Sequence, residues 1–306
     1  MMCVGFISGL KAELKGQKAY KLHGEEKYDE ALQLYREAVE SGLSTPRYLL
    51  AYSSLLVRTG AYQEAKELLI RIQKLPTISP EQKTTLFINY AACAYKLGEI
   101  DKGIRLLERQ HQHAPSGKLY QILGYLYVEK YDQSRTPDFD LMEQQAAEAK
   151  AAAEAANAES TYVPVCETSS EGEAPEGEVA VAGNAAEEPE QLSPREAWKQ
   201  QIDHAEAFLK EAIDYDEEDA ICLDNYAQFL YRVRGDKAEA RTWFDKAIAE
   251  KEGQIDTLWF LSRYDLEAGD TAAAAAKLRK ALEGRFSALN HVDEATVRSE
   301  LARIGG

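Results

Sequence analysis

Hydrophobic and polar positions recur along the chain with the period of an α-helix. In the stretch YDEALQLYREAV, residues 28–39, Ala31, Tyr35 and Ala38 fall on one helical face, and charged residues fall on the others. A large side chain between two small ones leaves a shallow seam into which a second helix can pack. The stretch therefore predicts an amphipathic helix with a close helical neighbour.

The same pattern returns along the chain: a small residue, a large one four positions later, and a third packing position three further on. The first members of its copies are Ala31, Ala65, Gly103, Ala205, Ala240 and Ala274. Successive copies begin 34, 38, 102, 35 and 34 residues apart. A period near 34 residues is typical of an array of helical repeats.

Each copy follows another helical segment and a turn signal. In four copies the turn carries a glycine five positions before the small residue, namely Gly60, Gly98, Gly235 and Gly269. Glycine takes a positive φ without steric cost, so it can end one helix and let the next begin within a few residues. The pattern predicts a repeating unit of helix, tight turn and helix.

The upstream helices carry packing residues at fixed spacing. The sets are Phe87, Tyr90, Ala91 and Ala94; Tyr120, Leu123, Gly124 and Tyr127; and Leu223, Tyr226, Ala227 and Leu230. In these residues, and in Pro115 at the close of a repeat, most of the chain resembles the tetratricopeptide repeat (TPR) family. The resemblance implies an all-α fold. It would be a right-handed superhelical α-solenoid of helix-turn-helix repeats with a C-terminal capping helix, and its upstream helices would line a concave groove.

The interval of 102 residues equals three periods, and we interpret it as an insertion within the fourth repeat rather than two hidden repeats. Residues 1–131 would form an N-terminal array of three repeats plus the first helix of a fourth. Residues 132–194 would form an acidic, Ala/Glu-rich insertion. Residues 195–306 would form a C-terminal array: the second helix of the fourth repeat, two further repeats, and a capping helix from about Val292 to Ile304.

The insertion has two parts of different composition. Its first part is rich in Ala and Glu without a large apolar stripe, which predicts an exposed helix from about Leu141 to Ala156. Its second part carries Gly, Pro, Ser and Glu without periodicity. Such a segment buries too little surface to offset its ordering entropy, so we expect it to be disordered.

Composition narrows the functional classes. The chain has 306 residues, 45% of them hydrophobic, and a formal net charge of −16, so we expect a protein that binds neither nucleic acid nor a membrane. The apolar run at its start is short, and no basic residue precedes it, which argues against a secretory signal. The four cysteines are scattered, which is typical of reduced thiols and indicates the cytoplasm.

No signature of catalysis or of a bound cofactor emerges. The motifs GxSxG, HExxH, GxxxxGK[ST] and GxGxxG are all missing, so we expect no enzymatic activity and no cofactor. His111 and His113 are two residues apart, so they would point to different faces of a helix. We interpret them as a polar helix end rather than a metal site.

Helical register predicts which side chains face the groove and could bind an unknown protein or peptide partner. These are Arg47, Arg58, Asn89, Tyr95, Lys96, Lys118, Gln121, Tyr125, Asn225, Tyr231 and Arg232. Amides can bond a peptide backbone, and Tyr adds contact area at low entropy cost. The prediction is a non-catalytic scaffold for protein–protein interaction. Two alternatives stay open: the side chains are merely solvated, or the protein is a peptide-sensing regulator or chaperone-like member of the family.

One known binding mode is excluded. Chaperone-binding members of the family hold a C-terminal carboxylate with Lys, Asn and Arg at set positions of three upstream helices. The matching positions here are Glu13, Gln17, Ala51, Thr85 and Asn89. This carboxylate clamp is therefore missing.

Charge is unevenly distributed along the chain. Residues 1–131 carry a net charge of +4, residues 132–194 carry −13, and residues 195–306 carry −7. A tethered acidic segment reaches a high effective concentration at nearby cations. One hypothesis is that the insertion transiently occupies the N-terminal groove at Arg47, Arg58, Lys96 and Lys118. The alternative is a solvated spacer that keeps the protein soluble.

Overall fold

The computed structural model describes the backbone of residues 2–160 and 192–305 and the side chains of residues 9–152 and 192–305. The described residues form helices and connecting segments without a β-strand. They divide into two compact units, one of residues 2–134 with 205–305 and one of residues 135–160 with 192–204. The first unit holds the repeat array, and the second holds most of the predicted insertion.

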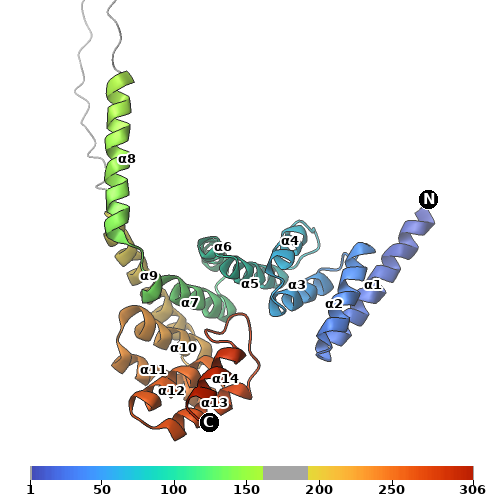
Figure 1. Cartoon of the computed structure of the whole chain (residues 1–306). Helices are drawn as coiled ribbons and strands as arrows, with labels where there is room; N and C mark the ends of the chain where they lie inside the picture. Colours follow the sequence, from blue (N-terminus) through green and yellow to red (C-terminus); the bar gives the residue numbers. More distant parts are fainter. Residues whose placement is uncertain (1, 161–191, 306) are drawn as a thin grey trace, which may run out of the picture. The chain divides into compact units, whose positions relative to one another are not determined.

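The first compact unit consists of six helix pairs and a final helix (Figure 1). The pairs are α1 (Met2–Gly24) with α2 (Tyr28–Glu40), α3 (Pro46–Arg58) with α4 (Tyr62–Gln73), α5 (Pro80–Lys96) with α6 (Ile100–His113), α7 (Gly117–Tyr131) with residues 205–215 of α9 (Pro194–Tyr215), α10 (Ala220–Phe229) with α11 (Lys237–Glu250), and α12 (Ile255–Glu267) with α13 (Thr271–Leu282). Helix α14 (Glu294–Arg303) follows the pairs. A 3-10 turn η1 (Gln133–Arg135) comes shortly after α7, and a π-helical turn η2 (Leu230–Arg234) extends α10. The predicted all-α repeat fold is confirmed, whereas the right-handed superhelix stays a prediction.

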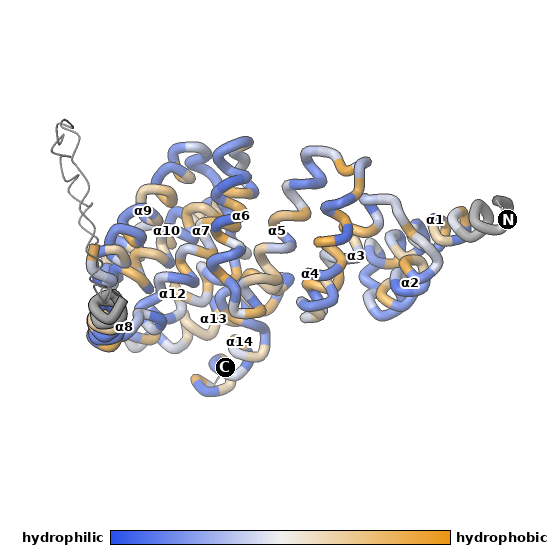
Figure 2. Tube along the Cα trace, turned by 90° about the horizontal axis from the view of Figure 1, so that it is seen from above, coloured by the Kyte–Doolittle hydropathy of each residue, from blue (hydrophilic) through white to orange (hydrophobic). Residues whose placement is uncertain are grey.

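The seam pattern sets the packing within the pairs. Apart from Gln110 in the third copy, which is half-buried, its residues are buried: Ala31, Tyr35, Ala38, Ala65, Leu69, Ile72, Gly103, Leu107, Ala205, Leu209, Ala212, Ala240, Phe244, Ala247, Ala274, Leu278 and Ala281. Individual helices carry both hydrophobic and hydrophilic positions, as amphipathic helices do (Figure 2). At Gly103 the second helix of its pair comes so close to the first that an added Cβ atom would lie 3.2 Å from the Ala91 carbonyl oxygen.

The turns between paired helices adopt the predicted conformation. The four glycines named above have φ values between 73° and 81°. In the first pair the same position, five residues before Ala31, is occupied by Glu26, which has a φ of 62°. Among the described residues, Glu26 is the only non-glycine residue with a positive φ.

The capping helix begins as the sequence predicts. The Asp293 side chain accepts a hydrogen bond from the Thr296 backbone nitrogen at 2.7 Å and so caps α14. The connection between α13 and α14, residues 283–293, is much longer than the turns within the pairs. Figure 1 shows it as a long loop that runs away from those two helices.

The second unit contains α8 (Phe139–Ser160) and residues 194–204 of α9. The helix predicted for residues 141–156 is therefore present and longer than expected. Arg195 contacts Asp140 at 2.8 Å, and the ring centroids of Phe139 and Trp198 are 6.2 Å apart. Residues 161–191, for which we predicted disorder and a large share of the acidic charge, lie outside the described residues.

Within the described ranges, no helix is long and apolar enough to cross a membrane. In the same ranges, no group of three or more His, Cys, Asp or Glu side chains is arranged to hold a metal ion. Cys93 and Cys222 are free and buried. Burial raises the pKa of the Cys93 thiol to about 11, so it stays protonated at neutral pH.

Candidate partner-binding groove

The first helices of the pairs share one surface. The segment between α13 and α14 lies on this surface. We call residues 284–292 the strap, and the surface of α1, α3, α5, α7, α10 and α12 that faces it the groove. Arg285 of the strap pairs with Glu26, just after α1. Tyr125 of α7 donates a hydrogen bond to the Asn290 carbonyl oxygen at 3.4 Å. The strap thus contacts both early and late repeats.

Asp256 of α12 is the main polar anchor of the strap. Its carboxylate accepts hydrogen bonds from the Asn290 side-chain amide at 3.1 Å, from the His291 backbone nitrogen at 3.0 Å and from the Val292 backbone nitrogen at 3.5 Å. Burial raises the pKa of Asp256, although these hydrogen bonds oppose the rise. The groove therefore recognises backbone and amide groups of a non-helical segment.

The strap itself is folded into a turn. The Asn290 backbone nitrogen donates to the Ser287 carbonyl oxygen at 3.2 Å, and the Asn290 side-chain oxygen accepts from the Ser287 backbone nitrogen at 2.7 Å. The side-chain oxygen of Asn290 therefore closes the turn, and its side-chain nitrogen binds Asp256. This double use makes Asn290 the central polar residue of the strap.

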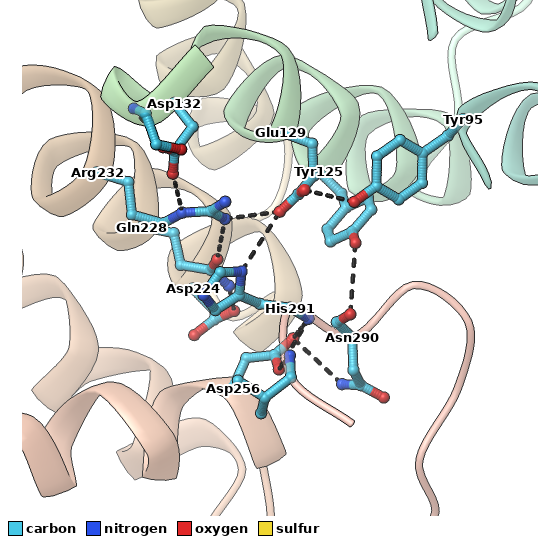
Figure 3. Close-up of polar contacts among 12 residues, drawn as sticks. Tyr95, Tyr125, Glu129, Asp132, Asp224, Gln228, Arg232, Asp256, Asn290 and His291 are labelled. Carbon is cyan, nitrogen blue, oxygen red and sulfur yellow. Dashed lines mark hydrogen bonds and ion pairs between the residues drawn. The ribbon is translucent and has the colours of Figure 1, made fainter. Parts of the chain in front are cut away.

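A buried ion-pair network lies next to the strap (Figure 3). Arg232 contacts Glu129 and Asp132 at 2.7 Å each, and the Tyr95 hydroxyl donates to Glu129 at 2.5 Å. His291 of the strap approaches Glu129, with 3.5 Å between Nδ1 and the carboxylate. Burial opposes ionisation of Glu129, but these contacts outweigh it and hold the pKa of Glu129 well below its usual range.

The network continues into α10. Gln228 accepts a hydrogen bond from Arg232 at 3.0 Å and donates one to Asp224 at 2.7 Å, and Thr257 donates to Asp224 at 2.6 Å. Burial raises the pKa of Asp224, and the neighbouring charge of Asp256 raises it further. Arg232 lies in the π-helical turn η2, a local departure from α-helix that often accompanies functional sites.

Two open cavities border the N-terminal part of the groove. The first, of about 610 Å³, is lined by Arg58, Tyr62, Lys96, Trp259 and strap residues. We call it the cationic cavity. The second, of about 430 Å³, also includes Arg58, together with Tyr20, Tyr28, Ser54 and Arg285 among its lining residues. Arg58 therefore lies where the two cavities meet.

The sequence-predicted partner residues divide into exposed cations and residues that are at least half-buried. Arg47, Arg58, Lys96 and Lys118 are exposed. The guanidinium groups of Arg47 and Arg58 lie 4.6 and 5.4 Å from the ring centroids of Tyr20 and Tyr28. Exposed cations beside aromatic rings are suited to bind an anionic group.

The other predicted residues are half-buried or buried, and hydrogen bonds or ring contacts hold them within the chain. Asn89 donates to Ser54 at 2.9 Å, Gln121 donates to Asp219 at 2.7 Å, and Asn225 donates to the Gln121 carbonyl oxygen at 2.8 Å. Tyr231 lies among aromatic rings, with its centroid 5.1 Å from that of Phe260. Tyr95, Tyr125 and Arg232 belong to the strap contacts and the network described above.

Sequence reasoning missed the strap and its anchors, Asp256 and Glu129. A signal was present, because the segment GRFSALNHV is too long for a turn between paired helices and carries Phe286, Leu289 and Val292 at regular intervals. Apolar residues in a long connection indicate a segment that packs against the rest of the molecule.

Comparison with known proteins supports the fold and goes no further. No family model matches the sequence, and no curated protein matches it. Among solved structures, a thermophilic TPR protein of Thermus thermophilus matches with a TM-score of 0.54 and 16% identity, covering 85% of this chain and 98% of that one. PilW, a type IV pilus biogenesis factor, matches with a TM-score of 0.52 and 12% identity, covering 95% and 98%.

These likenesses agree with the repeat period, the seams and the glycine turns found in the chain itself. The protein therefore has the fold of the tetratricopeptide repeat proteins.

Proposed function

We propose that the chain is a non-catalytic scaffold that binds a peptide or helical segment of a partner protein in the groove. One observation carries this proposal: the groove already holds a segment of the chain itself, through side chains of α7 and α12. A surface that binds backbone amides of one segment offers the same contacts to another. The free and buried Cys93 and Cys222 support a reducing compartment, so we propose the cytoplasm as its location.

The cationic cavity is the section of the groove that fits a partner best. Arg58 and Lys96 provide positive charge there, and Tyr62 and Trp259 provide aromatic surface. Asp293, which follows the strap and caps α14, is an acidic group at the same cavity. With two cations against this one carboxylate, and a net charge of +4 over residues 1–131, we expect an acidic partner segment.

The alternative function, a peptide-sensing regulator, requires an element that changes position when a partner binds. The strap supports this alternative because it crosses the same groove and is anchored mainly at one end. The two functions share the binding surface and differ in what binding does to the strap.

Affinity purification with mass spectrometry tests the proposal. Wild-type protein would be compared with the groove variant Arg58→Glu/Lys96→Glu. In a control variant, Arg71→Glu/Lys74→Glu, the same charge change is made at exposed positions on and just after α4, which is the second helix of its pair. We expect wild type and the control to recover a partner that the groove variant loses. Equal recovery by all three proteins would show that the partner does not bind at the cationic cavity.

A further inference from the structure

The contacts that hold the strap are contacts that a separate peptide could make. Asp256 binds the Asn290 side chain and two backbone nitrogens, and Tyr125 binds the Asn290 carbonyl oxygen. None of these interactions depends on the covalent connection to α13 or α14. The covalent connection contributes effective concentration, not specificity.

Space remains beneath the strap. A cavity of about 480 Å³ is lined by residues of α7, α10, α12 and the strap, and the apolar part of its wall includes Ile122, Ile221, Ile255 and Leu289. We call it the inner cavity. The strap approaches the wall closely at Gly284, where an added Cβ atom would lie 2.8 Å from the Ile255 side chain. The apolar part of this wall can receive an apolar side chain of a bound segment.

The two halves of the strap are held with unequal strength. Its end is fixed by the buried Val292, which packs in the core of α12, α13 and α14. Residues 284–290 are held by half-buried apolar side chains, among them Phe286 and Leu289, by the Asn290 contacts described above, and by the ion pair of Arg285 with Glu26, whose side chains are 62% and 53% exposed. Exposed ion pairs contribute little to stability because water competes for both groups. The side chains of residues 284–290 are half-buried or exposed, whereas Val292 is buried, so we expect residues 284–290 to leave the groove while Val292 stays in place.

We infer that the groove section formed by Tyr125, Asp256 and the inner cavity is a recognition site for a turn of the type Ser-x-x-Asn with an apolar residue before the Asn. The chain's own strap fills this site, and a partner segment of the same chemistry displaces residues 284–290. The strap lies beside the cationic cavity, so a partner that runs along the whole groove must open it. This inference rests on the proposed function for its biological meaning.

Displacement has a quantitative consequence. A tethered strap competes with any free segment. The apparent association constant of the free segment is therefore its intrinsic value multiplied by the fraction of molecules in which the strap is open. If the strap is open in about 1% of molecules, weakening it raises the apparent affinity up to about a hundredfold. The strap would thus set a threshold for partner binding.

A peptide of the strap's own sequence, GRFSALNHV, provides the probe. Its fluorescein-labelled form would be titrated by anisotropy against wild type and against the strap variant Leu289→Ser/Asn290→Ala, which leaves the groove helices unchanged. We expect at least about tenfold tighter binding to the strap variant. Adding Asp256→Asn to that variant, or replacing Asn by Ala in the peptide, should abolish binding. Equal binding to wild type and to the strap variant, or no binding to either, would overturn the inference.

Hydrogen exchange of the wild type gives a second test that needs no variant. We expect the amides of residues 284–290 to exchange faster than the helical amides of α12, because the strap opens without unfolding the repeats. Protection equal to that of α12 would make the strap a permanent part of the fold and would contradict the inference. Neither test uses a natural partner, so a failure to find one would refute the proposed function without affecting this site.

Discussion

Glu26 has a left-handed backbone conformation, with a φ of 62°, and its carboxylate pairs with Arg285, which follows it by 259 residues. The four corresponding turns of the later repeats place glycine at this position. A glutamate there costs backbone energy, because its Cβ crowds the neighbouring carbonyl group. The first turn thus keeps a strained residue whose side chain reaches the strap.

Glu26→Gly should relieve this strain and release the beginning of the strap. We expect the free energy of unfolding to stay the same or rise by up to about 1 kcal/mol, because the lost ion pair is exposed. We also expect faster amide exchange in residues 284–289. Urea denaturation and hydrogen exchange by mass spectrometry would measure the two effects.

Gly98→Ala is the matched control for this turn. Gly98 has a φ of 78°, so alanine there should destabilise the protein by about 1 kcal/mol without altering exchange in the strap. If Glu26→Gly destabilised the protein as much as Gly98→Ala does, the strain assigned to Glu26 would be refuted.

The helices and turns could be predicted because their causes are local. Ala31, Tyr35 and Ala38 share a face by helical geometry alone, and Gly98 has its positive φ because a tight turn requires it. Register also placed Tyr125 on the groove side of its helix. It could not show that Asn290, 165 residues later, would cover that side chain. The apolar residues of the segment indicate that it packs against the molecule, but its sequence does not show against which helices, so its place on the groove was not predicted.

Arg232→Gln tests the buried network. The side chains of Arg232 and Glu129 are 8% and 3% exposed, so removing the cation leaves Glu129 charged and buried. We expect a loss of about 3 kcal/mol in the free energy of unfolding at pH 7, measured by urea denaturation. The loss should shrink towards pH 5, because burial without the cation raises the pKa of Glu129 and lets it take up a proton.

Arg241→Gln is the control for that variant. Arg241 pairs with Asp245 at 2.9 Å on an exposed face of α11, so its loss should cost less than about 0.5 kcal/mol. Similar losses in the two variants would mean that the Arg232 network contributes no more than a surface ion pair.

The paired carboxylates Asp224 and Asp256 predict a dependence of stability on pH. Because the pKa of Asp224 is raised in the folded protein, the folded state holds a proton that the unfolded chain releases above its ordinary pKa of about 3.9. This group's contribution to stability therefore falls as the pH rises from about 4 through its raised pKa. Asp224→Asn should become more stable relative to wild type between pH 5 and pH 8. Parallel stability curves for the two proteins would contradict this assignment.

Ala240→Leu tests the seam between α10 and α11. Ala240 is fully buried where the two helices approach, so the larger side chain should overpack the seam and cost about 1–3 kcal/mol. Ala238→Leu, at an exposed position of the same helix, should have little effect. An unchanged thermal midpoint for Ala240→Leu would show that the repeat register is wrong there.

Site-specific photo-crosslinking tests the central claim, that the groove binds a partner, most directly. A photoreactive amino acid at position 58 or 96 would face the cationic cavity, whereas one at position 71 would lie on α4, a second helix. We predict that a partner protein is crosslinked from positions 58 and 96 and not from position 71. Crosslinks from position 71 alone, or equal crosslinks from all three positions, would contradict the claim that the groove is the binding surface.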